Sequence, residues 1–165
     1  MNKNALLIAG GVAFLVIWFI GWLAVAAWLW ERNVTIADTA TYSVKFGIIG
    51  TDSSGQPFIS QETTTIPLRY KDSGFRYGLV ITSSTNGTFS YQCIFHFSAP
   101  PKITSGGFDS SIPSQVMKTP MAQASGTALD YYWFDPGDPD GDQSLDVIVN
   151  GKLIQTIHYT VVPSS

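Results

Sequence analysis

The sequence predicts an N-terminal transmembrane α-helix followed by one all-β domain, an antiparallel β-sandwich. Two observations predict this division of the 165 residues. Residues 5–30 contain no Asp, Glu, Lys or Arg, whereas all 12 acidic residues lie after them. From residue 41 onward, apolar side chains alternate with polar ones between stretches rich in Gly, Pro, Ser and Thr, which is the pattern of short strands and turns.

The uncharged run Ala5–Trp30 is long enough to cross a bilayer. As an α-helix, its 26 residues have a length of about 39 Å, whereas the hydrocarbon core is about 30 Å thick. Trp28 and Trp30 stand at the end of the run, as membrane-interface residues do, because indole rings favour the headgroup region. We therefore expect a short cytoplasmic tail (residues 1–4), a signal-anchor helix in the lipid bilayer (5–30), a connector (31–40) and an extracytoplasmic β-sandwich (41–165).

A cleaved signal peptide is the alternative for the same run. Ala24-Val25-Ala26 fits the small-x-small pattern of cleavage sites. The apolar stretch is longer than the roughly 7 to 15 residues of a signal peptide, which favours a retained helix. We therefore expect a single-pass protein of the cell membrane, with its C-terminal domain in the periplasm or outside the cell.

The alternating pattern after residue 41 predicts about seven strands, at residues 42–48, 58–70, 75–81, 89–97, 127–134, 145–149 and 157–161. Asn150-Gly151 is the strongest hairpin signal, because both residues tolerate a positive φ. Residues 83–87 predict a second hairpin, and Pro67 predicts an edge or a bulge in its strand. Residues 99–124 are expected to be a long connection between sheets. Seven short antiparallel strands are typical of an immunoglobulin-like β-sandwich.

Five short motifs spread over most of the predicted sandwich suggest a family. They are Phe46-Gly47-Ile48, Ile66-Pro67, Phe75-Arg76-Tyr77-Gly78, Pro100-Pro101 and Asn150-Gly151-Lys152-Leu153. On these motifs the segment resembles a bacterial family of uncharacterised envelope β-sandwich domains. The resemblance implies the fold and no activity, because none of the motifs carries specific chemistry.

The charge of the predicted domain excludes one class of partner. Residues 31–165 hold all 12 acidic residues and eight of the nine Lys and Arg, so their net charge is negative. Nucleic-acid-binding domains carry a basic patch or stripe that neutralises phosphates. We therefore expect no nucleic-acid partner.

Residues 130–146, which lead from the predicted strand 127–134 to the predicted strand 145–149, are rich in carboxylates. Residues 130–146 hold six of the twelve acidic residues and no Lys or Arg. Asp135, Asp138, Asp140 and Asp142 supply the oxygen ligands that Ca²⁺ prefers, although the spacing is not that of an EF-hand. The alternative is a solvated turn, since Asp, Pro and Gly favour turns for their backbone conformations. No other cofactor is expected.

Four consecutive aromatic residues place rings on both faces of one predicted strand. Tyr131, Tyr132, Trp133 and Phe134 therefore require a cover on the second face. The cover is either the connection 99–124 or an interaction partner, a protein or a glycan, that uses flat aromatic contacts.

Catalytic groups are sparse in the sequence, and no enzyme is expected. Cys93 is the single cysteine and lies on the apolar side of its predicted strand, whereas His96 falls on the opposite face. His158 is isolated on the polar side of another strand. The sequence contains neither a Gly-x-Ser-x-Gly motif nor a phosphate-binding loop.

These observations predict a binding or scaffolding accessory subunit of a membrane or envelope complex, whose partner is another membrane or envelope protein. Two alternatives remain open at this point. One is a calcium-dependent module that binds a saccharide or a peptide. The other is a structural protein of a membrane-containing virus or of a surface appendage.

Overall fold

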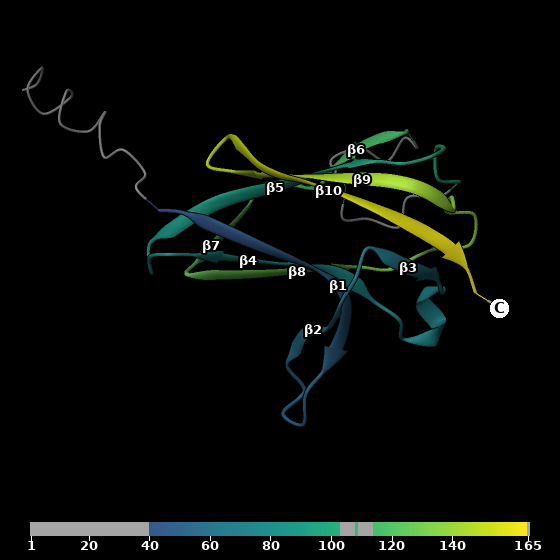
Figure 1. Cartoon of the computed structure of the whole chain (residues 1–165), viewed down its shortest axis with the longest axis horizontal. Coiled ribbons are helices and arrows are strands. Elements are labelled where there is room, and N and C mark those ends of the chain that lie inside the picture. The colour runs from purple at the N-terminus through teal and green to yellow at the C-terminus, as the bar shows by residue number, and fades with distance from the viewer. Residues whose placement is uncertain (1–39, 103–107, 109–113, 165) are drawn as a thin grey trace, which may run out of the picture. The chain divides into compact units, whose positions relative to one another are not determined.

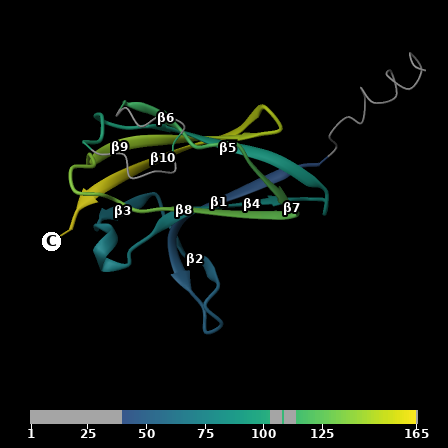
Figure 2. The same ribbon diagram turned by 180° about the vertical axis from the view of Figure 1, so that it is seen from behind.

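Two layers of β-strands face each other across an apolar core in the computed structural model of the protein (Figure 1). The structure describes residues 40–102, 108 and 114–164. The same two layers are seen from behind in Figure 2. Neighbouring strands are antiparallel except for one pair. The prediction of an all-β, antiparallel sandwich is therefore confirmed.

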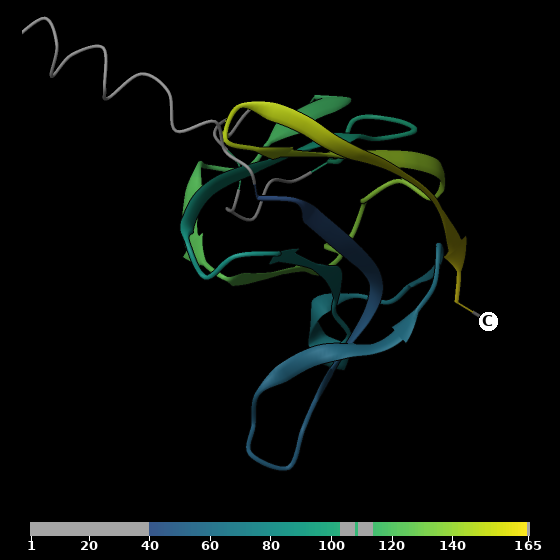
Figure 3. The same ribbon diagram turned by 60° about the vertical axis from the view of Figure 1, so that its left-hand side comes forward.

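The first layer has the strand order β2 (Pro57–Glu62), β1 (Tyr42–Thr51), β4 (Tyr77–Ser83) and β8 (Thr127–Tyr132). Val44 pairs with Ile81, and Phe46 pairs with Leu79, so one face of the layer is apolar as the alternation predicts. The register between β1 and β2 shifts after Ile48. Figure 3 shows the β1–β2 hairpin extending beyond the two layers.

The second layer has the order β5 (Thr88–His96), β9 (Gly141–Val149), β10 (Lys152–Pro163) and β3 (Thr65–Leu68). The short strand β6 (Val116–Lys118) pairs with β5 as well. Strand β3 is parallel to β10, with Ile66 beside Val161. A 3-10 turn, η1 (Lys71–Ser73), follows β3.

Strand β7 (Ala122–Ser125) joins the two layers at one corner. It pairs with β5 through four residues, but with β8 through Ser125 and Thr127 alone. Gly126 between them has a φ of 68°, a conformation that glycine adopts without steric cost. The two layers are thus joined at this corner and are free to separate beyond it.

The core lies between the two layers and is closed by side chains from both. Its largest fully buried members are Phe89, Phe95, Ile66, Leu79, Ile81, Leu145, Val147, Val149, Val161 and Cys93. Aromatic rings bridge the layers; the Phe46 and Tyr159 centroids, for example, are 5.1 Å apart. The described residues belong to one compact unit that begins at Ala40.

The strand count of about seven is too low, because the described residues form ten strands. The expected strand 58–70 is two strands, β2 and β3, which belong to opposite layers. The irregular connection 99–124 contains β6 and β7, both too short for a periodic pattern to reveal. Pro67 does lie in an edge strand, as predicted.

The two predicted hairpins have different outcomes. Asn150 and Gly151 have φ values of 49° and 73° and join β9 to β10, which confirms that hairpin. The hairpin at residues 83–87 is wrong, because β4 pairs with β1 and β8, whereas β5 pairs with β6, β7 and β9. That loop crosses between the layers instead of connecting neighbours.

The predicted tail, transmembrane helix and most of the connector lie outside the described residues, as do Trp28 and Trp30. Among the residues that the structure does describe, none forms a helix with the length and hydropathy needed to cross a bilayer.

Candidate functional site

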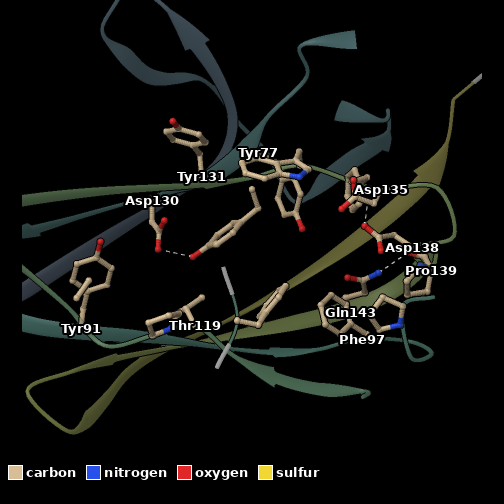
Figure 4. Close-up of a pocket in the computed structure, with 17 residues that line it drawn as sticks. Tyr77, Tyr91, Phe97, Thr119, Asp130, Tyr131, Asp135, Asp138, Pro139 and Gln143 are labelled. Atoms are coloured by element: carbon tan, nitrogen blue, oxygen red, sulfur yellow. Dashed lines mark hydrogen bonds between the residues drawn. The ribbon is translucent and has the colours of Figure 1, made fainter. Parts of the chain in front are cut away.

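A pocket of about 280 Å³ opens between the two layers. Strands β7 and β8 pair through a single pair of residues. Beyond that pair, β8 in the first layer and β5 in the second layer diverge, and the pocket lies between them. Figure 4 shows the side chains that surround it. Eight of the residues that line it are aromatic: Tyr77, Tyr91, Phe97, Phe108, Tyr131, Tyr132, Trp133 and Phe134.

Asp130 lies at one end of the pocket, on the inward face of β8. Its Oδ2 accepts a hydrogen bond of 2.9 Å from the hydroxyl of Tyr132 (Figure 4). Burial raises the pKa of this carboxyl and also raises the pKa of the Tyr132 hydroxyl, because both charged forms are poorly solvated there. The side chain of Tyr91 lies on the opposite wall of this end, and burial raises its pKa to about 12.

Asp138 lies at the other end, in the turn that leads from β8 to β9. Its Oδ2 accepts a hydrogen bond of 2.8 Å from the backbone N–H of Asp135. Burial is the main reason that the pKa of Asp138 rises to about 6; the hydrogen bond from the Asp135 N–H opposes this rise, and the charge of the Asp135 carboxylate adds to it. The same turn is held by Gln143, whose Nε2 donates to the carbonyl of Pro139 over 2.8 Å.

Two buried tyrosines, one from β4 and one from β10, pack against each other beside the pocket. Tyr77 of β4 stacks on Phe134 with a centroid distance of 4.6 Å. The hydroxyl of Tyr159, on β10, donates to Oε1 of Gln143 over 2.9 Å. Burial raises the pKa of both Tyr77 and Tyr159, so both hydroxyls stay protonated at neutral pH. The pocket therefore combines rigid apolar walls with a carboxyl group at each of its two ends.

The four aspartates of the predicted calcium loop have separate roles. Asp135 and Asp138 line the pocket, whereas Asp140 is exposed. Asp142 lies on the exposed face of β9, where its Oδ1 accepts a hydrogen bond from Thr160. No three His, Cys, Asp or Glu side chains among the described residues are placed to hold a metal ion together. Alternation along β9 separates Asp142 from the pocket, since Asp142 and the buried Gln143 point to opposite faces.

The four consecutive aromatic residues also divide between two faces. Tyr132 and Phe134 pack into the core, where the Tyr132 ring lies 4.7 Å from that of Phe95. Figure 4 shows the ring of Tyr131 pointing away from the other labelled side chains. The guanidinium carbon of Arg76 lies 4.7 Å from the centroid of the Tyr131 ring, and the Lys71 ammonium lies 4.5 Å from that of Trp133.

Described residues of the connection 99–124 line the same pocket as the four consecutive aromatic residues. Pro101, Phe108, Thr119 and Pro120 line the pocket, and the Phe108 ring makes an edge contact with Phe95. The described part of this connection thus borders the space between the layers, while Arg76 and Lys71 contact the rings of Tyr131 and Trp133.

Cys93 is buried, and burial raises the pKa of its thiol to about 12, so it stays protonated and unreactive. His96 lies on the other face of β5, where its Nε2 is 2.9 Å from Oδ2 of Asp146. The hydroxyl of Thr156 donates to the other oxygen of Asp146 and, with His96, lowers the pKa of that carboxyl. Cysteine and histidine are therefore separated by the sheet, as the alternation predicts.

Several pocket residues were not singled out from the sequence, namely Tyr77, Tyr91, Thr119 and Gln143. Asp130 was noted only as part of the acidic segment. A signal for it exists, since Asp130 occupies the inward register between Ala128 and Tyr132. A carboxylate in a core-facing register indicates a functional or specially solvated position.

Fold and pocket together define a two-layer β-sandwich with a binding-type cavity between its layers. The family model of the PM0630 beta sandwich domain matches residues 44–162, so the chain belongs to this family. This match confirms the β-sandwich family resemblance inferred from the short motifs. No curated protein sequence matches the chain.

Solved structures are similar in fold. An immunoglobulin-like protein from Pseudomonas aeruginosa has a TM-score of 0.50 and 16% identity, and the match covers 78% of this chain and 100% of that one. A β-glucosidase from Listeria innocua in complex with isofagomine has a TM-score of 0.36 and 8% identity, over 76% of this chain and 16% of the enzyme. An alkylpurine DNA glycosylase from Pseudomonas fluorescens, bound to DNA, has a TM-score of 0.33 and 12% identity, over 72% of this chain and 30% of the glycosylase. The first match supports the immunoglobulin-like architecture.

Proposed function

We propose that the protein is a membrane-anchored binding module, an accessory subunit that works on the extracytoplasmic side of a membrane or envelope complex. The pocket between the layers carries this proposal. Cavities lined by aromatic side chains with a few fixed polar groups are the usual form of a binding site. Here the polar groups are Asp130 and Asp138, each held by a hydrogen bond within the protein.

The uncharged run 5–30 supports the membrane location of the module. Ten residues, the length of the connector 31–40, span at most about 33 to 36 Å when fully extended. The sandwich would therefore work close to the bilayer surface, which favours a partner that is itself in the membrane or next to it.

A labelling experiment tests the anchor and its orientation. Single cysteines are introduced by Asn4→Cys and Lys152→Cys, and intact cells are treated with a membrane-impermeant maleimide. The native Cys93 is buried and does not interfere. We expect the protein to sediment with membranes, residue 152 to react in intact cells and residue 4 to react only after lysis. The reverse labelling pattern refutes the orientation, and a protein that stays in the supernatant refutes the anchor.

A pull-down tests the binding role of the pocket. The full-length protein is captured from mild detergent beside two variants, and bound proteins are identified by mass spectrometry. Ala122→Phe places a ring in the pocket, whereas Gln123→Phe places the same ring on the exposed face of the same strand. We expect the wild type and Gln123→Phe to retain a defined membrane or envelope protein that Ala122→Phe loses. Equal recovery with all three chains argues against the pocket as the binding site.

A further inference from the structure

The walls of the pocket are unusual in their charge. Three carboxyl groups line it, those of Asp130, Asp135 and Asp138. Among the described residues, the lining contains no Lys, Arg or His. The side chain of Lys102 packs against Gly137, next to Asp138, but it does not line the pocket. A half-buried carboxylate that no cation contacts keeps part of its desolvation cost, and a bound cation would offset that cost.

The aromatic walls favour the same kind of ligand. Cations are attracted to the faces of aromatic rings by the negative charge above the ring plane. The protein already makes this contact with its own cations, since Arg76 lies over the ring of Tyr131 and Lys71 over that of Trp133. Inside the pocket, the Tyr77 ring stands between the two carboxyl ends (Figure 4), and the Phe134 ring stacks on it.

We propose that this pocket binds a small organic cation, an alkylammonium group, between its aromatic walls and the carboxylates of Asp130 and Asp138. The inference rests on the proposed binding function of the pocket, and it does not depend on the membrane anchor. The cavity volume of about 280 Å³ is at the lower end of the range for ligand sites. The site therefore suits one small amine or one side chain, such as a lysine side chain presented by a partner protein.

Calorimetric titration of the full-length protein, purified in a maltoside detergent, tests the charge requirement. Choline is compared with 3,3-dimethyl-1-butanol, which has the same shape but a carbon atom in place of the charged nitrogen. A capped lysine, N-acetyl-lysine methylamide, is compared with capped norleucine for the second source of the cation. We expect at least one cation to bind about tenfold more tightly than its neutral counterpart.

Either pattern of cation binding supports the proposal and identifies the source. Choline bound in preference to capped lysine indicates a free amine, and the opposite preference indicates a side chain of a protein. The proposal is overturned if neither cation binds, or if the neutral counterparts bind equally well. Binding of glucose in place of both cations also overturns it, because a neutral saccharide has no need of the carboxylates' charge.

Asparagine substitutions locate the site. Asp130→Asn and Asp138→Asn keep an acceptor oxygen in place, and each is tested alone and in combination. Asp140→Asn is the matched control, since it removes the same charge from an exposed residue of the same turn that does not line the pocket. We expect the affinity for the cation to fall about tenfold in the double variant and to stay unchanged in the control. Equal losses in all variants place binding elsewhere and refute the assignment.

The outcome is separable from that of the pull-down. If Ala122→Phe releases a protein partner while no cation binds to the wild type, the binding role stands and the cation assignment fails. If a cation binds but no partner is retained, the pocket assignment stands and the role as an accessory subunit fails.

Discussion

Replacing Asp138 by Asn is expected to stabilise the domain at neutral pH. Burial raises the pKa of this carboxyl from its ordinary 3.8 to about 6. For a fully shielded group this difference corresponds to about 3 kcal/mol. The side chain is only partly buried, so solvent screening reduces the effect to about 1 kcal/mol. Asn keeps an oxygen that accepts the hydrogen bond from the N–H of Asp135, but it carries no charge.

The pH dependence follows from the direction of the pKa change. The protonated carboxyl contributes stability that is fully present below pH 3.8 and is lost as the pH rises through about 6. The difference in free energy of unfolding between Asp138→Asn and wild type should therefore be small near pH 4 and about 1 kcal/mol at pH 7.5. The contributions of other titrating groups to the free energy of unfolding cancel in this difference, because both chains contain those groups.

Thermal unfolding by circular dichroism between pH 4 and 8 measures this difference. A gain of about 1 kcal/mol corresponds to a Tm increase of about 3 to 5 °C for a domain of this size. Asp140→Asn is the control and should leave the Tm of the domain unchanged, since Asp140 is exposed. A stability difference that is constant with pH, or a larger loss for Asp138→Asn at pH 7.5 than at pH 4, refutes the reasoning.

Three further predictions concern the core and the backbone. Gly78→Ala should destabilise the domain by about 2 kcal/mol or more in chemical denaturation, because its Cβ would lie 2.1 Å from a carbonyl oxygen of β8, whereas Gly87→Ala should be tolerated. Leu145→Ala should lower the free energy of unfolding by about 2 to 5 kcal/mol, since Leu145 is fully buried. Leu153→Ala should lower it by less than about 0.5 kcal/mol, since Leu153 is exposed. Cys93 should stay unmodified by a maleimide in the folded protein at pH 7.5 and react fully after unfolding, because burial raises its pKa to about 12.

Each of these predictions has an outcome that contradicts it. Equal stability of the two glycine variants would mean that β4 and β8 separate without cost. A loss of the same size for both leucine variants would place the core elsewhere. Rapid labelling of the native thiol would show that β5 is accessible at the position of Cys93.

Local patterns predicted most of the individual strands correctly. Leu145, Val147 and Val149 alternate with polar residues and are all buried, because β9 has a core-facing side and a solvent-facing side. Phe89 and Phe95 follow the same rule in β5. The Asn150-Gly151 turn was also predictable, since the positive φ values it needs depend on these two residues alone.

The pairing of strands was less accessible to sequence reasoning. The loop 83–87 has the composition of a hairpin turn, yet it crosses from one layer to the other. A polar, flexible loop is compatible with both geometries, and the choice depends on which distant strands complete each layer. Residues 63–64 likewise connect β2 in the first layer to β3 in the second layer. The alternation of apolar and polar residues gives no sign of this change of layer.

The candidate site was partly visible in the sequence. The aspartate-rich turn and the aromatic run before it supply Asp138, Tyr132 and Phe134, which all line the pocket. No three His, Cys, Asp or Glu side chains among the described residues are grouped around a metal site, and calcium binding by this turn stays a prediction. Tyr77 and Tyr91 come from two other strands, so no local pattern connects them with this turn.

Local sequence was enough to predict the all-β class, the inward and outward faces of the longer strands and the closing hairpin, because each of these depends on residues close together in the chain. Which strands share a layer, and where the layers separate, depends on contacts between distant segments. The pocket depends on these distant contacts. It exists because β8 pairs with β7 through one pair of residues and otherwise pairs with β4 in the first layer. Contacts between distant segments create this divergence, and with it the placement of Asp130 and Asp138 at the two ends of one cavity.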